Sequence, residues 1–167
     1  ESCYNCGIFY LNGYGTEKND DLACKWFVKA AELNKEDSID RIEEIYKEKY
    51  QNEFDDKFFE LMEKLAVMGN GEAMCRIHFN YRDGIATEIN PEKAMHYLKA
   101  SIEKEFTSAY ILMGAYHLDG LYGVKKDFEK AIYYLEKATE KGSSNAANRL
   151  ATIYYSEKYT EKNIEKV

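Results

Sequence analysis

The chain repeats itself with a period of 35 to 37 residues, and this periodicity is the strongest restriction on its fold. Small residues recur at one position of the repeat, an apolar residue follows four positions later, and an aromatic side chain follows after four more. Residues spaced in this way lie on one face of an α-helix, so each repeat predicts a helix with a buried side. The three columns, which we call positions 1, 5 and 9, hold Ser2, Ser38, Ala73, Ala109 and Ala146, then Cys6, Ile42, Ile77, Met113 and Leu150, then Tyr10, Tyr46, Tyr81, His117 and Tyr154.

A second helix follows the first within each repeat. The first helix is expected to end at position 12, where a glycine can take the left-handed conformation of a helix end. The second helix is expected to start at an Asn or Asp whose side chain accepts a bond from an unpaired backbone N–H. The "NPEK" stretch is the clearest start, because proline at the first helical position loses no hydrogen bond. The predicted ends are Gly13, Gly84 and Gly120, and the predicted starts are Asn19, Asn90 and Asp127.

Tandem pairs of antiparallel helices predict an all-α, right-handed α-α superhelix. One helix pair cannot bury its own apolar face, so its stability comes from neighbouring pairs. The expected repeats span residues 2–37, 38–72, 73–108 and 109–145, with a partial fifth at 146–167. We expect these to form a single array within a longer chain, because Glu1 is not an initiator methionine.

The fourth repeat resembles a known family. Its sequence, "AYILMGAYHLDGLYGVKKDFEKAIYYLEKATEKGSSNA", combines a small–apolar–glycine start, the Gly120/Gly123 pair, a D-x-x-K-A segment and a closing glycine. These features are similar to the Sel-one-like repeat, a relative of the tetratricopeptide repeat, and the opening "CYNCGIFYLNGYGTEKNDDLACKWFVKAA" resembles it as well. The resemblance covers the whole chain and implies a scaffold that holds other proteins on its concave face, without catalytic residues.

The second repeat departs from this pattern. Glu43 stands where the first and fourth repeats have Gly7 and Gly114, and the third repeat has His78 at the same position. A side chain at a close-packing position is expected to push the two helices apart. We therefore expect a local change in superhelix curvature around the second and third repeats.

Composition excludes several function classes. A net charge of −7 argues against duplex nucleic-acid binding, which requires a basic surface that neutralises phosphates. No apolar run approaches the roughly 20 residues that a membrane-spanning helix needs, and no signal peptide is visible. The compartment stays open.

The cysteines and histidines are interpreted as packing residues. Cys3 and Cys6 form a C-x-x-C, but both lie in apolar columns, and free cysteine behaves as a small buried hydrophobe. A zinc site would need two more ligands, and the three histidines lie in the third and fourth repeats, at no ligand spacing. We predict no metal and no cofactor.

The sequence gives less support to an enzyme than to a binding protein. Ser101 to Lys104 reads S-x-x-K, a motif of penicillin-recognising serine enzymes, but the partner motifs S-D-N and K-T-G are absent. Ser101 also occupies a column of small packed residues. The predicted function is non-catalytic. The alternatives are an enzyme-associated bacterial member such as a β-lactamase-type repeat protein, or a structural spacer to a missing domain.

The favoured function is a protein–protein interaction scaffold or adaptor, for example a bacterial regulator, immunity protein or effector module. First helices are expected to line the concave groove, with positions 3, 7, 10 and 11 facing the partner. Exposed apolar side chains rimmed by charge are typical of partner sites, and the acidic balance favours a partner with basic surface. Burial of Phe79 and Leu118 would defeat this assignment. The predicted partner-binding residues are Tyr4, Ile8, Leu11, Glu44, Lys47, Phe79, Arg82, Asp83, Ile111, Leu118, Asp119 and Tyr155.

Overall fold

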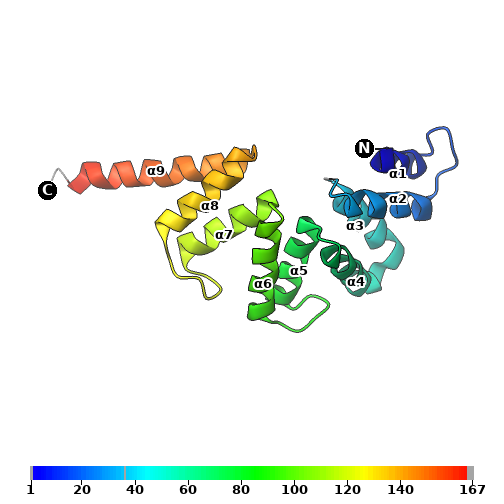
Figure 1. The fold of residues 1–167 in the computed structure, drawn as a ribbon, viewed down its shortest axis with the longest axis horizontal. Helices are drawn as coiled ribbons and strands as arrows, with labels where there is room; N and C mark the ends of the chain where they lie inside the picture. Colours follow the sequence, from blue (N-terminus) through cyan, green and yellow to red (C-terminus); the bar gives the residue numbers. More distant parts are fainter. Residues whose placement is uncertain (1, 36, 165–167) are drawn as a thin grey trace. The chain divides into compact units, whose positions relative to one another are not determined.

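A computed structural model describes residues 2–35 and 37–164, with side chains described as far as Tyr155. Every regular element in these residues is helical, as the repeat pattern predicts (Figure 1). The described residues contain nine α-helices and one short 3-10 helix, joined by loops. Their bounds are α1 Ser2–Asn12, α2 Asp20–Glu32, α3 Ser38–Tyr50, η1 Gln51–Glu53, α4 Phe54–Val67, α5 Gly71–Asp83, α6 Pro91–Glu103, α7 Thr107–Asp119, α8 Phe128–Glu140 and α9 Ser144–Ile164.

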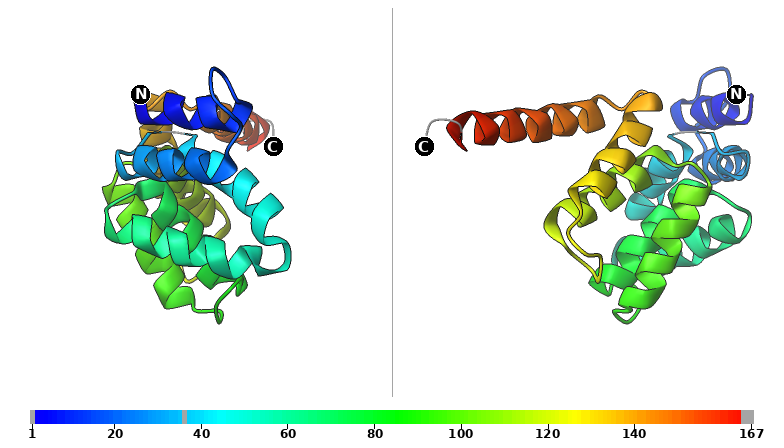
Figure 2. Two further views of the ribbon diagram at one scale, coloured as in Figure 1. Left: turned by 90° about the vertical axis from the view of Figure 1, so that its right-hand side faces the viewer. Right: turned by 60° about the vertical axis from the view of Figure 1, so that its left-hand side comes forward.

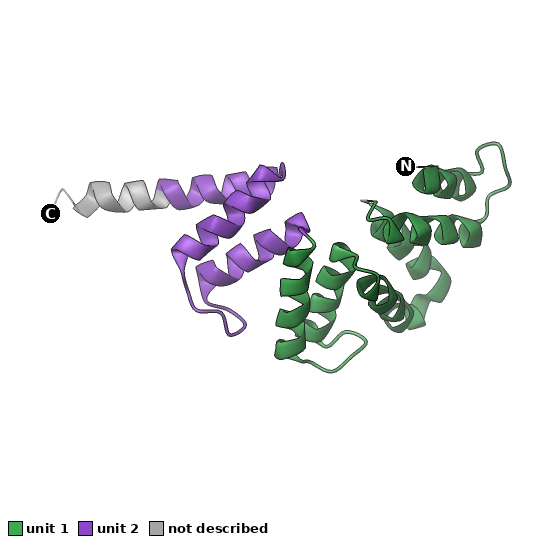
Figure 3. Cartoon of the chain, in the orientation of Figure 1, with its two compact units in different colours: residues 1–104 green, residues 105–167 purple. Residues whose placement is uncertain are grey.

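The helices group into two compact units, Glu1–Lys104 and Glu105–Val167 (Figure 3). The N-terminal unit contains α1 to α6, and its helix pairs α1–α2 and α5–α6 pack extensively along their lengths. The C-terminal unit contains the pair α7–α8, against which α9 also packs. Columns 1 and 5 of the repeat form the buried side of the first helices, as predicted, except at the N-terminal helix α1. Their buried members are Ser38, Ala73, Ala109, Ala146, Ile42, Ile77, Met113 and Leu150.

The predicted starts of the second helices are confirmed. Asn19, Asn90 and Asp127 accept hydrogen bonds from backbone N–H groups of the first turn, at 2.9, 2.9 and 3.0 Å. Each of these three residues also donates its own backbone N–H to the carbonyl of the position-9 residue of the same repeat, at 2.7 to 2.8 Å. These two bonds hold the loop between the helices of a pair.

Asn70 makes a further cap that joins two repeats. Its side chain accepts a bond from the N–H of Ala73 at 2.8 Å and donates one to the carbonyl of Ala31 at 2.8 Å. The side chain is buried, so both bonds replace water that the folded chain excludes. Asn70 therefore ties the start of α5 to the end of α2.

The predicted ends of the first helices are also confirmed. Gly84 and Gly120 cap α5 and α7 with φ angles of +71° and +70°, in the left-handed region. The second helices end in the same conformation at Gly69 and Gly142, and Glu105 adopts it too, with φ +59°. Glu105 thus keeps, without a glycine, the backbone geometry of Gly69 and Gly142.

The second repeat is built differently. Instead of the seven- or eight-residue loops of the other pairs, the short helix η1 connects α3 to α4. Figures 1 and 2 show no long loop between these two helices. Gln51 at the junction has φ +44° and ψ −105°, and no side chain caps the start of α4. The pair α3–α4 packs less extensively than α1–α2, α5–α6 or α7–α8. The loss of the glycine at position 12 thus coincides with a looser helix pair.

Gly7 and Gly114 occupy the close-packing position, as predicted. A Cβ atom at Gly7 would lie 2.6 Å from Cε1 of Phe27, and one at Gly114 would lie 3.0 Å from Cγ of Leu135. A side chain at Gly7 would therefore have to displace Phe27, and one at Gly114 would need Leu135 to shift slightly, because the interior is closely packed.

The expectation for His78 is wrong. Its side chain is buried, yet α5 and α6 pack as extensively as the glycine-containing pairs. Nδ1 of His78 lies 2.8 Å from the carbonyl oxygen of Ala94 on α6. The imidazole is accommodated because it hydrogen-bonds to the backbone of the facing helix instead of pushing it away. Glu43 does sit in a loosely packed pair, where it binds Lys47 at 2.6 Å and Arg76 at 3.2 Å.

Candidate functional site

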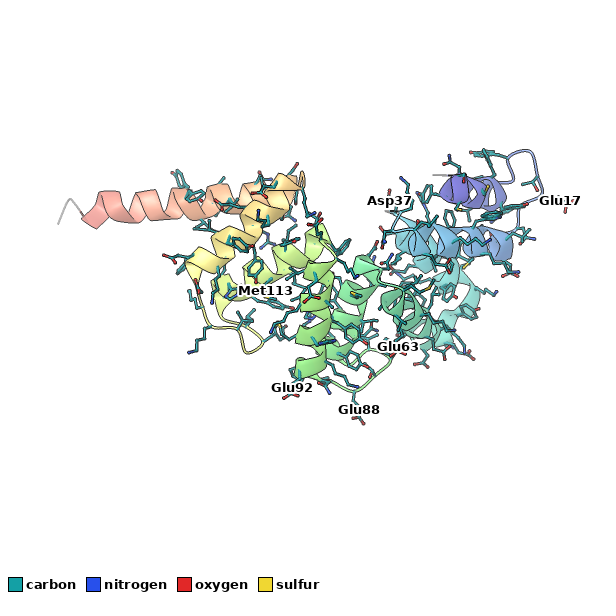
Figure 4. All side chains as sticks on the ribbon, viewed as in Figure 1. Glu17, Asp37, Glu63, Glu88, Glu92 and Met113 are labelled. Atoms are coloured by element: carbon teal, nitrogen blue, oxygen red, sulfur yellow. The ribbon has the colours of Figure 1, made fainter. Side chains whose placement is uncertain are left out.

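The twelve predicted residues all lie on first helices, and the candidate interaction surface is, within each unit, the side of these helices that carries them. We call it the first-helix surface. None of the twelve side chains is fully buried, and Phe79 and Leu118 are half-buried. The N-terminal unit carries eight of them, on α1, α3 and α5, and the C-terminal unit carries the other four, on α7 and α9. Acidic side chains elsewhere, such as Glu17, Glu88 and Glu92, project from the ribbon into solvent (Figure 4).

On α1, the predicted residues are only partly available. Tyr4, Ile8 and Leu11 are half-buried and pack against the hydrophobic core of the N-terminal unit. The ring of Tyr4 meets that of Phe27 edge to face, with centroids 5.3 Å apart. These three side chains therefore contribute to stability as well as presenting part of their apolar surface.

On α3, the predicted residues are charged and paired locally. Glu44 is exposed and accepts a bond from Arg41 at 2.9 Å, while Lys47 lies 5.5 Å from the ring centroid of Phe54. Hydrogen bonds with Tyr4 and Glu44 raise the pKa of Arg41.

On α5, Phe79, Arg82 and Asp83 form a compact group. The Arg82 guanidinium lies 4.6 Å from the ring centroid of Phe79, a cation–π arrangement. Arg82 also donates two hydrogen bonds to Asp83, at 2.7 and 2.6 Å, and these bonds lower the pKa of the Asp83 carboxyl. The group presents an aromatic face, a held cation and an ionised carboxylate side by side.

The sequence interpretation missed Arg76, which connects α5 to α3. Its guanidinium reaches Asp40 at 2.5 Å, Glu43 at 3.2 Å and Glu72 at 3.5 Å. Burial raises the pKa of Glu72, although Arg76 acts against this shift. Asp40 and Arg76 lie 36 residues apart, one repeat period, so opposite charges at neighbouring positions of successive repeats were the available signal.

In the C-terminal unit, the predicted residues range from half-buried to exposed. Ile111 and Leu118 are half-buried on α7, and Asp119 is exposed at its end. Tyr155 on α9 is 72% exposed, the most accessible aromatic among the twelve.

The cysteines show the properties expected of packing residues. All four are free thiols, with Cys75 buried and the other three half-buried. Burial raises the pKa of Cys24 to about 11 and that of Cys75 to about 12, so both thiols stay protonated at neutral pH. Among residues 2–35 and 37–164, no three His, Cys, Asp or Glu side chains are arranged to hold a metal ion.

Ser101 is also accounted for by packing. It is fully buried and donates its hydroxyl to the carbonyl of Gly71 at 2.6 Å, which joins α6 to the start of α5. A buried hydroxyl that donates to a backbone oxygen is not placed to attack a substrate. In the described part of the chain, no helix is both long and apolar enough to cross a membrane.

A family model described as "Sel1 repeat" matches residues 1–35, 72–106, 107–143 and 144–166. The chain belongs to the Sel1 repeat family. The unmatched stretch corresponds to the second repeat, the one that lacks the glycine turn. Sel1 repeat proteins are generally protein-interaction scaffolds and are typically non-catalytic.

Known proteins with similar sequence or fold agree with this membership. Chitin synthase regulatory factor 3 of Schizosaccharomyces pombe is 24% identical over 155 residues, which are 87% of this chain and 17% of that protein. The c5321 protective antigen of uropathogenic Escherichia coli, described as displaying an SLR fold, is 26% identical with a TM-score of 0.69, covering 93% of this chain and 33% of that one. A Sel1 repeat protein from Oxalobacter formigenes is 26% identical with a TM-score of 0.67, covering 92% and 62%. The chain thus spans less than two thirds of the length of each of these proteins.

Proposed function

We propose that the chain is a non-catalytic adaptor that binds a partner protein or peptide on its first-helix surface. The observation that carries this proposal is that Phe79, a large aromatic residue, is left partly accessible beside Arg82 and Asp83. Aromatic and arginine side chains tend to contribute most of the binding energy at protein interfaces. The yeast relative is named a regulatory factor, which is consistent with an adaptor role in regulation.

The charges of α3 and α5 suggest the chemistry of the partner. Asp40, Glu44 and Glu48 are exposed on α3, and Asp83 is exposed at the end of α5. Three of these carboxylates, Glu44, Asp83 and Asp40, pair with Arg41, Arg82 and Arg76, and Lys47 pairs with Glu43. A partner with a basic, partly apolar segment would complement this surface, and electrostatic attraction would speed its association.

Site-specific photo-crosslinking tests the surface directly. A crosslinking amino acid at Phe79 is expected to capture the partner from the native lysate, while the same group at Val67, 90% exposed on the second helix α4, should not. With the captured partner purified, Phe79→Ala and Arg82→Ala should each weaken binding about tenfold or more. Equal capture at both positions, or unchanged affinity in both variants, would reject the first-helix surface.

A further inference from the structure

A cleft of ≈ 740 Å³ opens between α2 and α3 in the N-terminal unit. It is lined by residues of these two helices and includes none of the twelve residues of the first-helix surface. A cavity of this size lies within the range of about 300 to 1,000 Å³ that is typical of ligand sites. No residue of α4 lines the cleft.

Three aromatic side chains line the cleft. Trp26 on α2 is half-buried, and on α3 the rings of Tyr46 and Tyr50 meet edge to face with centroids 4.8 Å apart. Burial raises the pKa of Tyr46 to about 12, so its hydroxyl stays neutral and can donate a hydrogen bond. Such rings offer a rigid, mainly apolar surface to the side chain of a ligand.

The net charge of the residues that line the cleft is positive, whereas that of the whole chain is negative. Lys25, Lys29 and Lys49 line it, against Asp21 and Glu32. Lys49 is bonded to Asp21 across the two helices. Lys25 and Lys29 are exposed and form no ion pair with any residue that the structure describes. The cleft therefore has a positive balance in a chain whose net charge is −7.

Lys29 stands next to the aromatic wall. Its Nζ lies 5.1 Å from the ring centroid of Trp26, so a cation and an aromatic face are held together on one turn of α2. Lys25 is exposed on the same helix, one turn earlier. Two cations beside an aromatic surface match a ligand with carboxylates flanking a large apolar side chain.

We propose that the α2–α3 cleft binds an acidic peptide segment that inserts one aromatic or large aliphatic side chain between Trp26 and Tyr46. The flanking carboxylates of the peptide pair with Lys25 and Lys29. This second site uses other residues and the opposite charge preference from the first-helix surface, and it does not depend on that surface being functional.

Intrinsic fluorescence offers a direct test, because Trp26 is the only tryptophan of the chain. The full chain would be titrated with acetyl-Asp-Glu-Phe-Leu-Glu-Asp-amide, its lysine counterpart acetyl-Lys-Lys-Phe-Leu-Lys-Lys-amide, and a version with alanines in place of Phe and Leu. The acidic peptide with Phe and Leu is expected to shift the emission and bind at least about tenfold more tightly than either other peptide. Equal binding of all three, or no change in emission up to millimolar peptide, would overturn the proposal.

Charge reversal identifies the residues involved. Lys25→Glu combined with Lys29→Glu is expected to reduce the affinity for the acidic peptide about tenfold or more. Lys99→Glu combined with Lys125→Glu makes the same change of charge at exposed positions of α6 and of the α7–α8 loop, and should reduce it less than twofold. A similar loss in both double variants would mean that only the overall charge matters, which contradicts a site at the cleft.

Two further titrations separate the alternatives. Phe79→Ala should leave peptide binding at the cleft unchanged, so failure of the first-helix surface and failure of this site are distinguishable. Decanoate, which offers one carboxylate and an alkyl chain without a peptide backbone, should change the Trp26 emission only weakly. Tighter binding of decanoate than of the acidic peptide would reject a peptide as the ligand.

Discussion

The first and second repeats lie next to each other in the N-terminal unit, but their two helices pack against each other in different ways. In the first repeat, Gly7 lets α1 lie directly against Phe27 of α2, and the N–H of Asn19 holds the loop to the carbonyl of Tyr10. In the second repeat, Glu43 replaces the glycine, η1 replaces the loop, and the helices pack less extensively.

The second repeat shows that other contacts can replace the close-packing glycine. The second repeat loses close backbone approach within its own helix pair, but Glu43 binds Arg76 of the next repeat. Tyr46 packs against Phe58 of α4, with ring centroids 6.2 Å apart. Charge pairing between repeats and aromatic contacts within the pair thus partly replace the glycine. The looser pair also accompanies the open cleft at α2 and α3.

The largest expected difference in stability is between substitutions at Gly7 and at Glu43. Gly7→Leu should lower the free energy of unfolding by about 3 kcal/mol, because the new side chain overlaps the fully buried ring of Phe27. Glu43→Leu adds no bulk to a position that already holds a long side chain, and should cost less than about 1 kcal/mol. Urea denaturation of both variants measures this contrast, and equal losses would show that packing of the two pairs is equivalent.

The next largest difference in stability is expected between two helix caps. Asn70 joins two repeats, whereas Asn90 caps a helix within a single repeat. Asn70→Ala removes a helix cap and leaves the buried carbonyl of Ala31 without its partner, so we expect a loss of about 2 kcal/mol. Asn90→Ala removes a cap at a less buried site and should cost about 1 kcal/mol. Thermal denaturation monitored by circular dichroism measures the difference. A larger loss for Asn90→Ala would contradict the role of Asn70 between repeats.

The third effect depends on pH and tests how His78 replaces glycine. Burial lowers the pKa of His78, so the native side chain stays neutral while the unfolded one binds a proton near its ordinary value of 6.5. The unfolding free energy should therefore fall as the pH drops below about 6.5, by at most about 1.4 kcal/mol per pH unit.

His78→Gln should reduce this fall between pH 7 and pH 5, whereas His96→Gln, at an exposed position, should keep it. Burial raises the pKa of Glu72, which makes the native state bind protons more readily and opposes the fall. That contribution is common to all three proteins and cancels in the comparison. Identical pH profiles for the two variants would exclude His78 as the source.

The smallest effect concerns the charge pairing between repeats. Arg76→Gln should cost about 1 kcal/mol at low salt, because Arg76 contacts three carboxylates but is itself one third exposed. The loss should shrink in about 1 M NaCl, where exposed charges are screened. Lys137→Gln, which removes a single exposed pair with Glu140 within α8, is the control and should cost less. A loss at Arg76 that does not change with salt would assign it to packing instead.

The sequence alone determined the repeat, the helical class, the buried columns and most helix ends. These features depend on residues close together in the chain: a glycine that takes a left-handed φ, an Asn that accepts from an N–H three residues later, or apolar residues spaced four apart. The resemblance to the Sel1 family followed from the same local patterns, and the one repeat that the family model leaves unmatched is the one whose pattern is weakest.

The tertiary structure alone decided how side chains from different helices meet. His78 and Glu43 stand at equivalent positions, yet one is buried against the Ala94 carbonyl and the other forms ion pairs in a looser helix pair. The role of Arg76 and the cleft beside Trp26 likewise depend on how neighbouring repeats pack. Local spacing cannot foresee these arrangements, because each is set by distances between atoms that lie far apart along the chain.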